Sequence, residues 1–194
     1  MKNAILVHGW NTHAQYVDST RQSASNDHWF PWLTKQLMIR GYKVDVPEMT
    51  QHSDSTYESW AKEFERFDIS DDTLLVGHSL GGGFLVRYLS EHPETRVGRV
   101  VLVAGWLGYD AEDYPEFNKT FFDFTIDKEL INRVHQLHVM YSLDDDAGTT
   151  DAVRVLRGHY PEAIYHEYTD RGHFTRDSLG TEEFPELLAI CTRR

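Results

Sequence analysis

The sequence predicts an α/β fold: one domain, residues 1–194, built on a mostly parallel sheet with helices on both faces. Short apolar runs alternate along the chain with segments whose apolar residues recur at helical spacing. The run at 73–77 is continuously apolar, which is typical of a strand covered on both faces, and the run at 97–105 indicates another buried strand. The chain contains no repeat, low-complexity segment or linker that would divide it, and 194 residues suffice for one sizeable core.

The first half of the chain is expected to alternate strands and helices. In the helix at 29–41, Trp29, Leu33 and Leu37 recur on one face, and Gly41 stands where a C-terminal cap belongs. The expected elements, in order, are a strand at 3–7, a helix at 29–41, a strand at 42–47, a helix at 57–67, a strand at 73–77 and a helix at 80–92.

The same alternation is expected to continue through the second half. The elements are a strand at 97–105, a helix at 127–136, a strand at 137–142, a helix at 149–159, a strand at 163–168 and a helix at 185–191. Two stretches, 11–28 and 106–126, are longer than ordinary connections. Such length is typical of segments that border a functional site or move.

Composition narrows the class of partner and the compartment. The net charge of −12 argues against a nucleic-acid groove or an anionic membrane surface, and it favours solubility. The single cysteine, Cys191, allows no intramolecular disulfide, which is typical of a reducing compartment. The first ten residues turn polar too quickly for a signal peptide, and no run approaches the roughly 20 apolar residues of a membrane span. We therefore expect a cytoplasmic protein.

Ser79 lies at the junction of an expected strand and helix, inside the pentapeptide GHSLG, residues 77–81. The Gly-x-Ser-x-Gly pattern is typical of a sharp turn that exposes a nucleophilic serine, because bulky neighbours would clash there. The helix that follows favours negative charge at its N-terminus. The alternative is a serine that only caps the helix. The glycine spacing fits neither a dinucleotide-binding nor a phosphate-binding loop.

A serine hydroxyl needs a base, and the base needs an acid to orient it. After such a serine turn the acid and then the histidine follow in chain order. His173 suits the base, since it follows a glycine in the loop between the strand at 163–168 and the last helix; His159 and His166 are less well placed. The candidate acids, Asp144, Asp145 and Asp146, follow the strand at 137–142, and composition does not choose among them.

The oxyanion formed during acyl transfer needs two backbone donors. We expect them to be the amides of Leu80, after the serine, and of Trp10, in the turn that Gly9 permits; an ordinary turn at the end of the strand is the alternative. Trp106 follows a strand on the same edge and is expected either to wall a substrate pocket or to pack in the core. Gly9 and His78 are weaker candidates for the pocket. Because the histidines lack His-Glu-x-x-His spacing and the chain has one cysteine, we expect neither metal nor cofactor.

Five segments carry a resemblance to a known family: ILVHGW, LLVGHSLGGG, VVLVAGW, YSLDDD and YTDRGHF. In this order they resemble the small serine hydrolases of the α/β-hydrolase superfamily, the group typified by the retinoblastoma-binding protein 9 and YdeN-like hydrolases. The resemblance implies a three-layer αβα sandwich without a lid domain and a Ser–Asp–His triad. The family's Ser-x-x-Asp pattern, counted from Ser142, implies Asp145 as the acid. Asp146 stands where the family often has proline.

The expected function is that of a carboxylesterase that cleaves small acyl esters through an acyl-enzyme, with Ser79, His173 and Asp145 as the triad. Two alternatives remain open. In the first, the chain is a thioesterase or amidase that uses the same triad. In the second, it is a binding or regulatory module that has kept a hydrolase scaffold. The resemblance supports the class of reaction better than the substrate.

Overall fold

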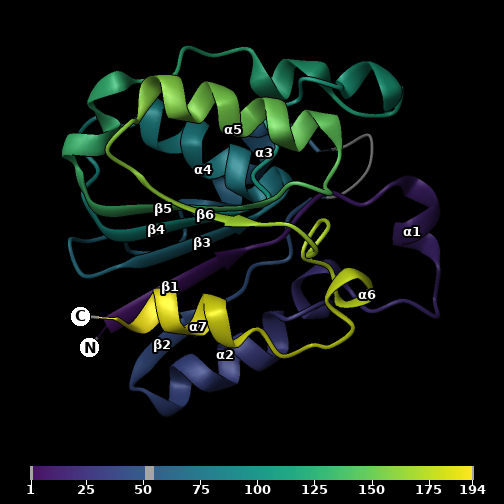
Figure 1. Cartoon of the computed structure of the whole chain (residues 1–194), viewed down its shortest axis with the longest axis horizontal. Coiled ribbons are helices and arrows are strands. Elements are labelled where there is room, and N and C mark those ends of the chain that lie inside the picture. Colours follow the sequence, from purple (N-terminus) through teal and green to yellow (C-terminus); the bar gives the residue numbers. More distant parts are fainter. Residues whose placement is uncertain (1, 51–54, 194) are drawn as a thin grey trace.

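A parallel sheet forms the centre of the molecule. The computed structural model describes residues 2–50 and 55–193, and it contains a six-stranded sheet of order β2-β1-β3-β4-β5-β6 (Figure 1). Every neighbouring pair of strands is parallel. The strands are β1 (Lys2–Val7), β2 (Tyr42–Asp45), β3 (Leu74–His78), β4 (Val97–Val103), β5 (Val134–Ser142) and β6 (Ile164–Tyr168).

Helices cover both faces of this sheet and complete three layers (Figure 1). The helices α3 (Tyr57–Phe64), α4 (Leu80–Glu91) and α5 (Ala147–His159) lie on one face. The helices α2 (Phe30–Ile39) and α7 (Pro185–Thr192) lie on the other. The predicted α/β fold and the three-layer sandwich are thus confirmed.

Alternate residues of the central strands enter two separate cores. In β1, Ile5 and Val7 join the core under α3, α4 and α5, whereas Ala4 and Leu6 join the core under α2 and α7. All four side chains are fully buried. This double burial is the reason that the strands read as unbroken apolar runs.

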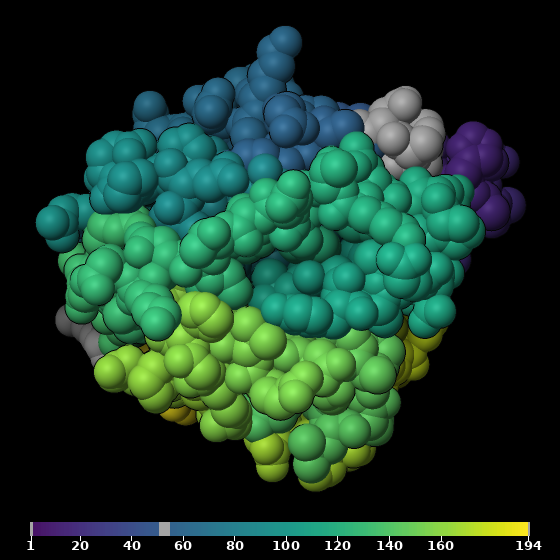
Figure 2. Space-filling model, turned by 90° about the horizontal axis from the view of Figure 1, so that it is seen from above, coloured from purple at the N-terminus to yellow at the C-terminus, as the bar shows by residue number. Residues whose placement is uncertain are grey.

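The two long connections carry short helices at the carboxyl edge of the sheet. Residues 11–28 include α1 (His13–Val17) and a 3₁₀ turn, η1 (Ala24–Asn26). Residues 106–126 include η3 (Ala111–Asp113) and η4 (Lys119–Phe122). Figure 2 shows this second segment beside α5, with the surface hollowed between them. The described part of the chain contains no separate lid domain, and none of its helices is both long and apolar enough to cross a bilayer.

The helix expected at 127–136 was wrong. Residues Lys128–Asn132 form a 3₁₀ turn, η5, and β5 already begins at Val134. Val134 pairs with Val97 of β4, and the Gln136 amide accepts hydrogen bonds from Arg99. Pairing with a neighbouring strand therefore overrides the local helical spacing in this segment.

Candidate active site

Ser79 lies on a strained turn at the carboxyl end of β3. Its φ of 54° and ψ of −121° are rare for a residue with a side chain. Neighbouring backbone holds the turn: the Ser79 amide donates to Val103 O at 3.0 Å, and its carbonyl accepts from the amides of Trp106 at 2.9 Å and Gly82 at 3.0 Å. The surrounding structure thus maintains a backbone conformation that the serine alone would avoid.

The glycines around Ser79 are required by close approach of the backbone. A Cβ at Gly77 would lie 2.6 Å from the carbonyl oxygen of Gly81, and a Cβ at Gly81 would lie 2.3 Å from that of Val7. Gly9 is also close to the turn, since a Cβ there would lie 3.0 Å from Ser79 Cβ. The sequence pattern therefore reflects the tight contact of β1, β3 and the start of α4.

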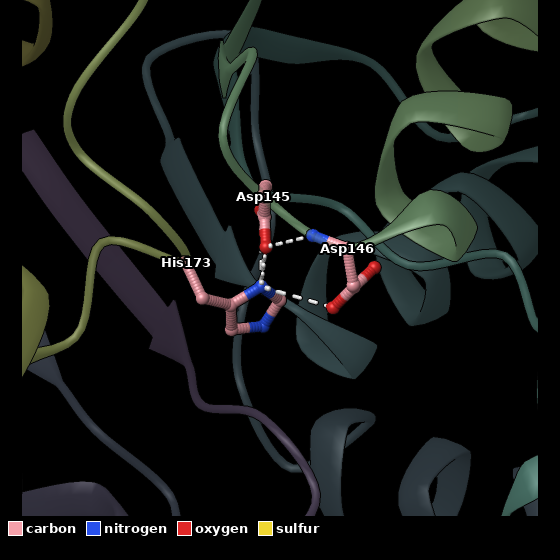
Figure 3. Close-up of side chains that lie close together, drawn as sticks. All are labelled: Asp145, Asp146 and His173. Atoms are coloured by element: carbon pink, nitrogen blue, oxygen red, sulfur yellow. Dashed lines mark hydrogen bonds and ion pairs between the residues drawn. The ribbon is translucent and has the colours of Figure 1, made fainter.

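His173 is paired with Asp145. Its Nδ1 lies 2.9 Å and 3.1 Å from the two carboxylate oxygens of Asp145, while Nε2 points away from the carboxylates (Figure 3). The Asp145 side chain is only 3% exposed, and that of His173 is 28% exposed. Burial lowers the pKa of His173, but the hydrogen bond and charge of Asp145, together with the charges of Asp146 and Asp110, raise it, and the net pKa lies above its ordinary value.

The neighbouring carboxylates have different partners. Asp144 Oδ1 accepts from the hydroxyl of Ser142 and, at 2.9 Å, from the Gly172 amide, so it ties down the loop before His173. The hydroxyl bond is the main cause that lowers the pKa of Asp144. Asp146 caps α5 by accepting from the Thr149 amide at 2.8 Å, and its other oxygen lies 3.8 Å from His173 Nδ1 (Figure 3). Of these three aspartates, all in the described part of the chain, Asp145 alone is hydrogen bonded to the imidazole.

His78 supports the loop that carries His173. Its Nε2 lies 2.8 Å from the backbone oxygen of His173 and donates to it. The ring packs among Trp29, Phe30 and His28. Burial, followed by the charge of His173, holds the pKa of His78 well below its ordinary value, so the ring stays neutral. The sequence offered His78 as a pocket residue; the structure adds this backbone contact, which no local pattern indicated.

His8 orients the peptide that contains the expected donor Trp10. Its Nε2 accepts from the Met49 amide at 2.8 Å, so Nδ1 carries the proton and donates to the Gly9 carbonyl at 2.6 Å. In a trans peptide the next amide points opposite to this carbonyl, which directs the Trp10 amide away from His8. The Leu80 amide is the first of α4 and, like other first-turn amides, has no acceptor within its helix.

Two cavities border Ser79 and His173, and we name them by their walls. The polar cavity, about 310 Å³, includes Arg21, Asp27 and Thr175 together with His78 and Gly9. The aromatic cavity, about 260 Å³, is lined by Trp10, Thr12, Gln15, Ser79, Trp106, Tyr114, Asp146 and His173. Trp106 is 7% exposed, so it both walls this cavity and packs against the core.

The Ser79 hydroxyl and the His173 imidazole both line these cavities. In the described structure they are not hydrogen bonded to each other. Such bonds are often loose before substrate binds.

Asp145, Asp146 and His173 also place ligand atoms within 4.8 Å of one another, a spacing that could hold a metal ion. The ring nitrogen of His173 that faces these carboxylates is Nδ1, which is already hydrogen bonded to Asp145.

The parallel sheet and the serine turn at the end of β3 are the features of the α/β-hydrolase fold. The chain belongs to the serine hydrolase family, whose model matches residues 4–193. It is 28% identical to the YdeN protein of Bacillus subtilis (strain 168) over 201 residues, covering 98% of this chain and 95% of that one.

Solved structures share the fold of this chain. The Bacillus subtilis ydeN product superposes with a TM-score of 0.80 at 24% identity, covering 99% of this chain and 97% of that one. Est1E from Butyrivibrio proteoclasticus gives 0.63 at 11% identity, covering 97% and 88%. Polyneuridine aldehyde esterase gives 0.63 at 15% identity, covering 98% and 97%. At these identities the likeness is one of fold. The match to the family model confirms the predicted family.

Proposed function

We propose that the chain is a carboxylesterase that cleaves small acyl esters through an acyl-enzyme formed on Ser79. The observation that carries the proposal is the His173 ring, which Asp145 holds at 2.9 Å and which borders both cavities beside Ser79. The name of polyneuridine aldehyde esterase, which shares the fold, favours an ester as the bond that is cleaved. The expected oxyanion donors, Leu80 and Trp10, complete the machinery.

Each residue has a defined part in the reaction. His173 takes the proton of Ser79 through Nε2 as the hydroxyl oxygen attacks the ester carbonyl. Asp145 keeps the other ring proton on Nδ1 and stabilises the imidazolium. The amides of Leu80 and Trp10 bind the oxyanion of the tetrahedral intermediate. His173 then protonates the leaving alcohol, and water activated by the same ring frees the acid.

A fluorophosphonate probe tests this proposal directly. We expect it to label the wild-type protein at Ser79 and to leave Ser79→Ala and His173→Ala unlabelled, because the first lacks the nucleophile and the second lacks its base. Mass spectrometry of the labelled peptide provides the measurement. Labelling at another residue would contradict Ser79 as the nucleophile, and no labelling of the folded wild type would favour the binding-module alternative. Rates on matched oxygen esters, thioesters and amides would separate an esterase from a thioesterase or amidase.

The raised pKa of His173 leads to a second expectation. The base works only when neutral, so activity falls as pH drops through its pKa, which lies above the ordinary value near 6.5. Asp146→Asn removes a negative charge 3.8 Å from Nδ1. We therefore expect the acid limb of kcat/KM to move to lower pH in this variant. Asparagine keeps an oxygen for the Thr149 amide, so helix capping is preserved. An unmoved acid limb would contradict this role for the charge.

A further inference from the structure

We propose that the aromatic cavity binds a cationic group of the substrate, a quaternary or protonated ammonium. The inference rests on the proposed esterase function and names the class of ester that the site takes. Three aromatic residues and one carboxylate line a single cavity that also reaches Ser79. A cation that lies against aromatic rings and next to a negative charge is stabilised by attraction to the ring faces and by attraction to the charge.

The aromatic walls are arranged around one small space. The Trp10 and Tyr114 rings are nearly perpendicular, at 85°, with centroids 5.9 Å apart. The Trp106 and Tyr114 rings meet at 75° and 5.7 Å. A volume of about 260 Å³ falls just below the roughly 300–1,000 Å³ of drug-sized sites, so it suits a compact head group.

The charge around this cavity is negative. Asp146 lines it with its side chain 45% exposed, and the Asp110 carboxylate accepts from the indole nitrogen of Trp106. Burial raises the pKa of the Tyr114 phenol, and the charges of Asp110 and Asp146 raise it further. Among the described residues that line the cavity there is no lysine or arginine. The field therefore favours a cation and disfavours an anion at this position.

The polar cavity differs because its buried carboxylate already has cationic neighbours. Asp27 lies 3.9 Å from Arg21 and 3.6 Å from Arg176. Within the described ion pairs, Asp146 has only the His173 ring, which must be neutral to act as the base. The carboxylate of the aromatic cavity is thus the one able to accept a cation from the substrate.

Choline and its uncharged carbon isostere, 3,3-dimethylbutan-1-ol, test the cavity independently of catalysis. We expect the wild type to bind choline about ten-fold more tightly than the isostere, measured by tryptophan fluorescence, because only choline carries the charge. Asp146→Asn should reduce this preference about three- to ten-fold. Asp151→Asn, which neutralises an exposed carboxylate paired with Arg154 on α5, is the matched control and should leave the preference unchanged. Equal or weaker binding of choline by the wild type would overturn the proposal.

Hydrolysis of the two acetate esters of these alcohols separates this proposal from the proposed function. A higher kcat/KM for acetylcholine than for 3,3-dimethylbutyl acetate, reduced by Asp146→Asn, supports both. Cleavage of the neutral ester without any preference for choline in binding or rate overturns the cationic site and leaves the esterase intact. Selective choline binding with neither ester cleaved supports the site and counts against the esterase.

Discussion

Replacing Asp145 by asparagine is expected to lower kcat about 10³- to 10⁴-fold while the protein stays folded. The Asp145 carboxylate is 3% exposed and accepts from His173 Nδ1 at 2.9 Å. An asparagine amide can donate to Nδ1 instead, which moves the ring proton to Nε2. In that tautomer the ring cannot take the proton of Ser79. Steady-state rates on p-nitrophenyl acetate and a thermal midpoint provide the measurement.

Asp144→Asn is the matched control for this prediction. The asparagine oxygen can still accept from the Ser142 hydroxyl and the Gly172 amide, so the loop before His173 keeps its contacts. We expect a loss of less than about ten-fold, in keeping with a supporting contact rather than a proton relay. A larger loss at Asp144 than at Asp145 would show that the triad acid has been assigned to the wrong residue.

Gly81→Ala is expected to destabilise the protein by about 3 kcal/mol or more, or to prevent folding. The new Cβ would lie 2.3 Å from the Val7 oxygen and 2.5 Å from the His8 oxygen. Both atoms belong to the backbone at the end of β1, which is paired with β2 and β3 and cannot move away alone. Urea denaturation followed by circular dichroism measures the change.

Gly158→Ala is the same chemical change as Gly81→Ala, but we expect it to stabilise the protein. Gly158 lies in α5, and a Cβ there meets no atom within 4 Å. We expect this variant to be stabilised by about 0.5–1 kcal/mol, because alanine favours the helix and loses less chain entropy on folding. If the two alanine variants had similar stabilities, the close approach of α4 to β1 could not be the reason for the glycine at position 81.

Much of the site could be predicted from short stretches of sequence. The GHSLG segment specifies its turn locally, since Gly77 and Gly81 are needed wherever a strand and the following helix come this close. His173 follows a glycine in a loop after a strand, which indicated its place on the same edge. The roles of Ser79, His173 and Asp145 in catalysis remain predictions that the variants above will test.

Other features of the site could not be predicted. The sequence fits Trp106 equally well as a pocket wall and as a core residue, because a sequence does not show which of its aromatic residues share a cavity. The structure places Trp10 and Tyr114 in the same cavity. The contact of His78 with the His173 backbone joins residues 95 positions apart. The helix expected at 127–136 failed for a related reason, since pairing with β4 decides that segment and the local spacing does not.

By itself, the sequence determined the alternation of strands and helices, the two-sided burial of the sheet and the serine turn. These features depend on periodicity and on steric demands within a few residues, so short stretches of sequence determine them. Only the tertiary structure decided which of three adjacent aspartates is bonded to His173 and which side chains enclose the two cavities. These features depend on contacts between residues that are distant in the chain. The local preferences of the candidate residues are nearly equal, so they do not decide which contacts form.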